Sequence, residues 1–207
     1  MKKISRWLAS FSFFILSLSY ADQSAIDKLS ALLNSFSTYQ AKFQQHTFSE
    51  QGRDIQHSQG SVQIKRPGKF RWKSLVPTQQ ILLTDGNTLW IYDVDLQQAS
   101  QQKLSSRVSI NPAMLLSGSV KDLSAVFSVS MMGTQKGETF FLTPKKSDLG
   151  FKQIVMIFED HRLVRMRVVN NLSQTSEFDF TNIMLNQPLS DQLFNFIPPK
   201  GVDVVAQ

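Results

Sequence analysis

The residue in this sequence best suited to specific chemistry is an arginine on an apolar face. Between Ser61 and Arg66 polar and apolar side chains alternate as in a half-buried strand, which turns Arg66 to the same side as Val62 and Ile64. A guanidinium keeps its charge and has five N–H donors, so on such a face it needs carbonyl oxygens nearby. A surface arginine at a Pro-Gly turn is the simpler alternative. We predict that another segment of the chain covers Arg66.

The alternation continues after the Pro-Gly step. Phe70 and Trp72 fall on one face, and Lys69, Arg71 and Lys73 fall on the other. Aromatic residues at this spacing pack in a core or line a cavity. Cations interleaved with aromatic rings also suit single-stranded nucleic acid, but here the two kinds of side chain lie on opposite faces. The basic face is better suited to anionic lipid or to an acidic partner surface.

The sequence contains no familiar catalytic or metal-binding motif. Its three histidines, His46, His57 and His161, have no metal-ligand spacing along the chain. There is no Gly-x-Ser-x-Gly elbow, Walker loop or recognisable pair of acidic residues, and there is no cysteine to form a disulfide or act as a nucleophile. We therefore expect no enzyme, no metal and no cofactor. A hydrolase built from dispersed residues is the alternative.

The N-terminus has the pattern of a signal peptide. Lys2, Lys3 and Arg6 precede an apolar run that is too short to span a bilayer, and residues 19–21 end it with a cleavage signal before Asp22. We expect residues 1–21 to be removed and residues 22–207 to form a single domain. The leader holds part of the formal charge of +6, which weakens the case for a nucleic-acid partner. With no cysteine to be lipidated, the exported protein is expected to be soluble.

Beyond the leader, the chain is a series of short strands. Apolar residues at helical spacing predict one amphipathic helix over residues 24–36. Short turns separate the strands, which favours an antiparallel meander over a parallel sheet. The predicted strands cover residues 38–48, 60–72, 80–84, 88–92, 126–131, 139–143, 151–158, 163–169 and 176–185.

A second helical segment, over residues 111–118, interrupts the strands. Asn111 can cap it, Pro112 suits its first turn, and Gly118 can end it. The segment is barely two turns long and must be held by packing. Its last carbonyls would be unpaired and partly negative, which suits Arg66. We predict a lid that is latched by Arg66 together with Met114, Leu115, Leu116 and Gly118.

Five segments of the chain match those of a known family: Lys65, Arg66, Pro67, Phe70 and Trp72, followed by residues 83–92, 112–116, 142–145 and 194–202. With these features the chain resembles the periplasmic outer-membrane lipoprotein carrier proteins, the LolA family. The resemblance implies a mainly β fold with a helical lid: an incomplete, unclosed antiparallel β-barrel around a hydrophobic cavity that receives lipoprotein acyl chains. It also implies that Arg66 bonds to the lid and that Phe70 lines the cavity.

The function implied by this resemblance is that of a soluble periplasmic shuttle. Such a shuttle takes acylated lipoproteins from an inner-membrane ABC-type release complex to an outer-membrane lipoprotein receptor. We expect a monomer with no nucleic-acid partner. The lack of cysteine fits the carrier and not the membrane-anchored acceptor, which has a similar fold and a lipidated cysteine. A stress sensor of similar fold is a further alternative, but it would need an additional domain.

Six side chains are assigned to the acyl-chain cavity. The inward direction of Arg66 sets the register of the first four. Residues 88–92 are apolar on both faces, so a slip of one residue would replace Leu89 and Ile91 by Trp90 and Tyr92. The assigned residues are Val62, Ile64, Phe70, Trp72, Leu89 and Ile91.

Overall fold

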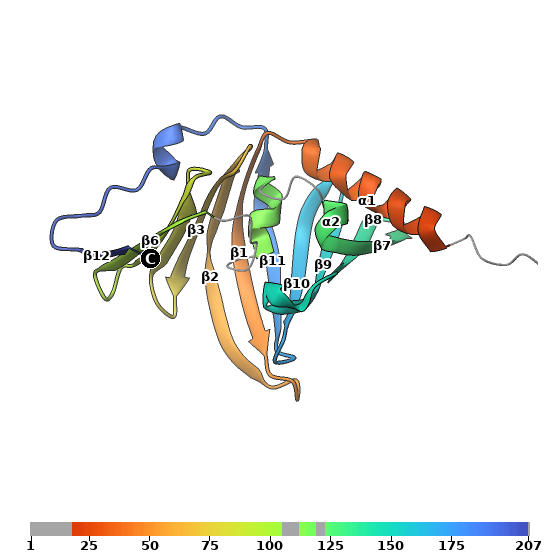
Figure 1. The fold of residues 1–207 in the computed structure, drawn as a ribbon, viewed down its shortest axis with the longest axis horizontal. Helices are drawn as coiled ribbons and strands as arrows, with labels where there is room; N and C mark the ends of the chain where they lie inside the picture. Colours follow the sequence, from red (N-terminus) through yellow and green to blue (C-terminus); the bar gives the residue numbers. More distant parts are fainter. Residues whose placement is uncertain (1–17, 105–111, 119–122, 207) are drawn as a thin grey trace, which may run out of the picture.

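The strands of this protein form one curved sheet, seen here in a computed structural model (Figure 1). The structure describes residues 18–104, 112–118 and 123–206. In these ranges the strands are β1 (Thr38–Phe48), β2 (Asp54–Lys65), β3 (Lys69–Val76), β4 (Gln80–Thr84), β5 (Thr88–Asp93), β6 (Gln98–Lys103), β7 (Phe127–Thr134), β8 (Gly137–Pro144), β9 (Phe151–Glu159), β10 (Arg162–Asn170), β11 (Thr175–Leu185) and β12 (Asp203–Ala206).

The sheet does not close into a barrel. Among the described residues its twelve strands have the order β12-β6-β5-β4-β3-β2-β1-β11-β10-β9-β8-β7, so β12 and β7 are its two edges. This confirms the predicted mainly β, unclosed barrel. One detail differs: β12 pairs with β6 in parallel, whereas the other neighbouring strands are antiparallel.

Sequence patterns located most strands but missed two of them, β6 and β12. The predicted and observed limits of β1 and β4 are the same. The strands β6 and β12 were not predicted; β6 is mostly glutamine and serine, and its backbone pairs with β5 on one side and β12 on the other. Backbone pairing of this kind leaves no apolar alternation in the sequence for a pattern to detect.

The predicted strand over residues 60–72 is two strands joined by a tight turn. β2 ends at Lys65 and β3 begins at Lys69, because Pro67 has no N–H to donate and Gly68 adopts a φ of +78°. β2 also begins earlier than predicted, at Asp54, and pairs with β1 along a long hairpin. The β2–β3 turn places Arg66 directly after the last residue of β2, near Phe36 just after the end of α1.

Helices lie over the concave side of the sheet. They are α1 (Leu18–Asn34), η1 (Pro112–Ser117) and α2 (Leu123–Val126). Of the two remaining 3-10 turns, η2 (Ser147–Leu149) precedes β9, and η3 (Asp191–Phe194) contacts the outer face of β3. α1 packs beside β7 (Figure 1), and Lys28 Nζ lies 2.8 Å from Glu138 Oε1 on β8. α1 begins at Leu18 and so overlaps the predicted signal peptide, whose residues 1–17 lie outside the described ranges.

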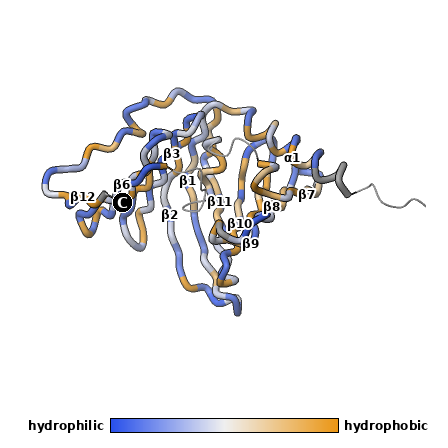
Figure 2. Tube along the Cα trace, viewed as in Figure 1, coloured by the Kyte–Doolittle hydropathy of each residue, from blue (hydrophilic) through white to orange (hydrophobic). Residues whose placement is uncertain are grey.

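The core joins the helices to the concave face of the sheet. Figure 2 shows hydrophobic and hydrophilic residues alternating along the strands, as expected for a sheet with one buried face. Ile26, Leu29 and Leu33 are the buried residues that the helical spacing of α1 predicted. Among the described residues, none of the helices is both long and apolar enough to span a membrane.

Candidate functional site

The six predicted cavity residues lie in two rows across β2, β3, β4 and β5. In the first row Ile64 pairs with Phe70, Phe70 with Thr84, and Thr84 with Leu89. In the second row Val62 pairs with Trp72, Trp72 with Leu82, and Leu82 with Ile91. Side chains opposite one another on neighbouring strands share a face, so the six form one surface on the concave side.

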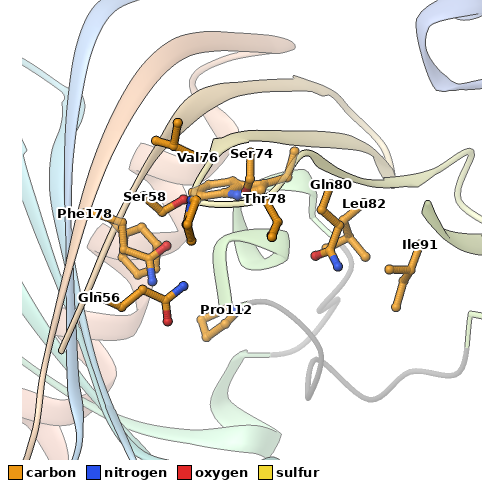
Figure 3. A pocket seen from close by; sticks show the side chains of 13 residues that line it. Gln56, Ser58, Ser74, Val76, Thr78, Gln80, Leu82, Ile91, Pro112 and Phe178 are labelled. Atoms are coloured by element: carbon orange, nitrogen blue, oxygen red, sulfur yellow. The ribbon is translucent and has the colours of Figure 1, made fainter. Parts of the chain in front are cut away.

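The first row is covered and the second borders an open groove. Ile64, Phe70 and Leu89 are each 0% exposed, and Val62 in the second row is also 0% exposed. Trp72 and Ile91 line a groove of about 330 Å³ (Figure 3). Its other lining residues are Gln45, Gln56, Ser58, Ser74, Val76, Pro77, Thr78, Gln80, Leu82, Pro112 and Phe178.

Trp72 belongs to an aromatic cluster on this concave face. Its ring stacks on Phe43 with the centroids 3.9 Å apart, and it meets Phe178 edge-on at 5.6 Å. Phe70 lies nearly parallel to Trp72 at 6.3 Å. Phe43 and Phe178 were not among the predicted cavity residues. Phe178 could have been predicted, because Phe178 and Phe180 alternate with polar residues on β11.

The neighbouring strand positions Trp90 and Tyr92 lie on the opposite, outer face. Both rings pack against Phe196, at centroid distances of 5.0 and 5.3 Å. Leu89 and Ile91 therefore take the concave face. β5 is apolar on both faces, and the contact with Phe196 of the C-terminal segment determines which face points outward.

The lid segment is a 3-10 helix that packs on β2 and β3. Its residues Met114, Leu115 and Leu116 are buried and belong to the same core as the cavity rows. The backbone N–H of Gly68 donates to the carbonyl of Ser117 at 2.8 Å, which ties the β2–β3 turn to the end of the lid. No role was predicted for Gly68. The predicted cap Asn111 lies outside the described residues.

Arg66 lies against the C-terminal end of the lid. Gly118 has a φ of +74°, and a Cβ at this position would lie 2.7 Å from Arg66 Nη2 and 3.0 Å from Nε. The guanidinium carbon also sits 5.6 Å from the centroid of the Phe36 ring. Only glycine combines this backbone conformation with such a close approach. The structure therefore brings together the arginine and the lid glycine that the sequence analysis associated.

One nitrogen of the guanidinium lacks a hydrogen-bond partner among the described residues. Arg66 Nη1 is buried and has no hydrogen-bond partner in the described part of the chain. Burial lowers the pKa of Arg66, although the ordinary value is so high that the group stays charged. Beside it is a cavity of about 220 Å³ lined by Ser30, Leu33, Asn34, Arg66, Leu115, Gly118 and Leu123.

The basic face of β3 is covered by the C-terminal segment of the chain. Lys65 Nζ and Lys69 Nζ lie 2.8 and 2.7 Å from Asp191 Oδ1, and Arg71 Nη1 donates to the Leu193 carbonyl at 3.1 Å. Hydrogen bonds from the two lysines lower the pKa of Asp191 from 3.8 to about 2. Lys69 and Arg71, two of the three basic residues that suggested an anionic partner, thus bind part of the same chain, and Lys65 at the end of β2 joins them.

The fold and site define a class of protein: a half-barrel whose apolar concave face is covered by helices. Within this class the chain belongs to the LolA family, because the family described as "Outer membrane lipoprotein carrier protein LolA" matches residues 34–197. An outer-membrane lipoprotein carrier protein of Coxiella burnetii is 49% identical over 201 residues, covering 97% of this chain and 95% of that protein. Another, from Hahella chejuensis, is 38% identical and covers 90% of each chain.

Solved structures share the fold at low sequence identity. A LolA superfamily protein from Nitrosomonas europaea has a TM-score of 0.51 and 13% identity, covering 85% of this chain and 98% of that one. An uncharacterized conserved protein from Thermus thermophilus has a TM-score of 0.53 and 13% identity, covering 92% and 100%. Both likenesses concern the fold.

Proposed function

We propose that this protein carries outer-membrane lipoproteins through the periplasm by covering their acyl chains on its concave face. The observation that carries the proposal is the two-row apolar surface on β2 to β5, lying under a separate lid, in a chain of the LolA family. Such a surface binds by burial and needs no reacting group. The proposed role is therefore that of a carrier, not an enzyme.

The lid is the internal competitor that such a carrier needs. Burial of one long acyl chain contributes on the order of 10 kcal/mol, at about 0.8 kcal/mol per methylene, which would make release very slow if nothing replaced the chain. Met114, Leu115 and Leu116 are buried in the same core as the apolar rows, and their helix η1 packs on β2 and β3. When cargo leaves, these side chains take over part of the buried surface, so the net free energy of release is smaller than the gross value.

Loading requires the lid to move. The open groove, at about 330 Å³, is at the lower end of the size range for ligand pockets, and four of the six predicted cavity residues are fully covered. Lifting η1 would expose these four and join them to the groove. The hydrogen bond from Gly68 to Ser117 and the contact of Arg66 with Gly118 are two interactions that help to hold the lid at this end.

The carrier role also defines two partners and a direction. In this proposal the leader is removed, an inner-membrane ABC-type complex releases the lipoprotein to the carrier, and an outer-membrane receptor receives it. A receptor that binds the acylated cargo more tightly draws the transfer forward, so this chain needs no nucleotide of its own. We propose that it acts as a monomer.

Release of a lipoprotein from inner-membrane vesicles tests the proposal. Vesicles that hold a newly acylated lipoprotein are incubated with ATP and the purified protein, and the supernatant is examined by size exclusion and native mass spectrometry. A soluble one-to-one complex is expected. The same lipoprotein without its acyl chains is the control. Equal recovery of both forms, or no recovery of either by the folded protein, would refute an acyl-chain carrier.

A further inference from the structure

The long β1–β2 hairpin brings together the side chains of His46, Asp54 and His57. Their spacing along the sequence does not indicate a common site. His46 and His57 are directly opposite one another in the ladder, and their ring centroids are 4.3 Å apart. Asp54 Oδ2 lies 3.4 Å from His46 Nδ1 and 2.9 Å from His57 Nε2. The sequence shows no metal-ligand spacing because the pairing of two strands, not a helical repeat, brings these side chains together.

Strand geometry explains why the cluster lies away from the cavity. Gln45 and Ser58 line the groove on the concave face, and their neighbours His46 and His57 point to the outer face. A shift in register between Thr47 and Phe48 places Asp54 next to the two rings. The cluster is thus separated from the proposed lipid site by the thickness of the sheet.

We propose that His46, Asp54 and His57 bind one divalent transition-metal ion. Their three ligand atoms all lie within 4.8 Å of one another. Tetrahedral coordination with bonds of about 2.0–2.1 Å requires ligand atoms about 3.3–3.4 Å apart. The separations of 3.4 and 2.9 Å from Asp54 Oδ2 to the two histidine nitrogens are close to this value, and those nitrogens lie within 4.8 Å of each other. Two imidazoles and a carboxylate suit Zn²⁺, Ni²⁺ or Cu²⁺ better than Mg²⁺ or Ca²⁺, which prefer oxygen ligands.

The surroundings favour an open site and not a closed structural one. The side chains of His46, Asp54 and His57 are 39%, 35% and 64% exposed, so a fourth ligand can come from water or from another molecule. Glu177 on β11 is opposite His46 in the strand ladder. Its carboxylate Oε1 lies 3.6 Å from Arg167 Nε, so this carboxylate already has a cationic partner and is not counted among the metal ligands. The hairpin is held by its ladder hydrogen bonds, so metal binding can be measured without unfolding the protein.

Titration of Zn²⁺ into the untagged mature protein tests the site. Isothermal calorimetry should give one ion per chain for the wild type, and His46→Gln and His57→Gln should each weaken binding by at least about tenfold. His161→Gln is the matched control, because His161 is the third histidine, is exposed, and lies in the turn between β9 and β10. Binding that survives both hairpin changes, or that His161→Gln removes equally, would refute the site.

A second measurement on the wild type keeps the test independent of any variant. Electron paramagnetic resonance with one equivalent of Cu²⁺ should show coupling to two imidazole nitrogens. A signal with no imidazole coupling, or no binding of either ion, would show that the cluster is only a set of hydrogen-bonded and ion-paired side chains. None of these results depends on lipoprotein carriage, so the two proposals succeed or fail separately.

Discussion

At the scale of single residues, we propose that the contact between Arg66 and Gly118 helps to hold the lid closed. The guanidinium approaches so near that a Cβ on Gly118 would lie 2.7 Å from Nη2, while Nη1 has no hydrogen-bond partner within the described ranges. A buried cation with an unused donor is costly unless an acceptor comes close. Arg66 is therefore positioned to respond to small movements of the lid or to an arriving polar group.

Replacement of Gly118 should lower the free energy of unfolding by more than the left-handed backbone conformation of this residue would cost by itself. In Gly118→Ala, left-handed backbone strain of about 1–2 kcal/mol is joined by the clash with Arg66, so the free energy of unfolding of the empty protein should fall. Gly52→Ala is the control: Gly52 has a φ of +76° and open space where its Cβ would be. Denaturant unfolding compares them. Equal losses in both variants would mean that Arg66 does not pack tightly against the lid.

Arg66→Leu should separate loading from delivery. Without the guanidinium the lid loses a contact and the rim becomes more apolar, so the open, cargo-binding state gains population. Capture from inner-membrane vesicles should persist or increase, whereas transfer to the acceptor should fall because the loaded state is more stable. Both yields are measured on one preparation. Loss of capture with normal transfer of whatever is bound would instead make Arg66 a direct cargo contact.

At the scale of elements, the C-terminal segment acts as a strap on the outer face of β3 and β5. Asp191 meets two lysines, Arg71 holds the Leu193 carbonyl, and Phe196 packs on Trp90 and Tyr92. These contacts reserve the outer faces of the two strands for the chain itself. The concave faces are then the ones left for the lid and the cargo.

The ionic part of this strap should depend on pH in a defined window. The folded-state pKa of Asp191 is lowered to about 2, so its stabilising contribution is present above the ordinary value of 3.8 and is lost as the pH falls through about 2. Resonances of residues 190–196 in NMR spectra should shift over this range. In Asp191→Asn they should no longer follow that titration. An unchanged titration in the variant would assign the effect to another acid.

At the scale of the whole molecule, the proposed function makes the lid and the acyl chain competitors for one apolar surface. The core that connects α1, η1 and the concave face is continuous, so opening the lid exposes side chains that only another apolar body can cover. A carrier of this kind holds its cargo reversibly because both of its states are covered.

This competition predicts that binding depends on acyl-chain length. A hydrophobic fluorescent probe should occupy the cavity, and acylated peptides should displace it, with affinity rising roughly tenfold for each two methylenes added until the cavity is filled. The non-acylated peptide is the control. In Trp90→Phe, Trp72 becomes the single tryptophan of residues 22–207, and its fluorescence reports on the groove directly. Displacement that ignores chain length would favour a general peptide binder.

Local patterns in the amino-acid sequence were enough to place most of the strands, the inward direction of Arg66, and the lid residues. Alternation is a local property: once Arg66 shares a face with Val62 and Ile64, the pattern reveals it without knowledge of the fold. The motifs also revealed the family. Polar strands such as β6 were missed because backbone pairing leaves no trace in side-chain hydrophobicity.

Features that depend on contacts between distant segments emerged only from the folded chain. Phe196 assigns Trp90 and Tyr92 to the outer face, and strand pairing brings His46 to His57. Gly68, with no predicted role, donates to Ser117 of the lid. Each of these contacts is set by the curvature and register of the whole sheet, which no local pattern encodes, because the free energy that selects them comes from burying the shared core.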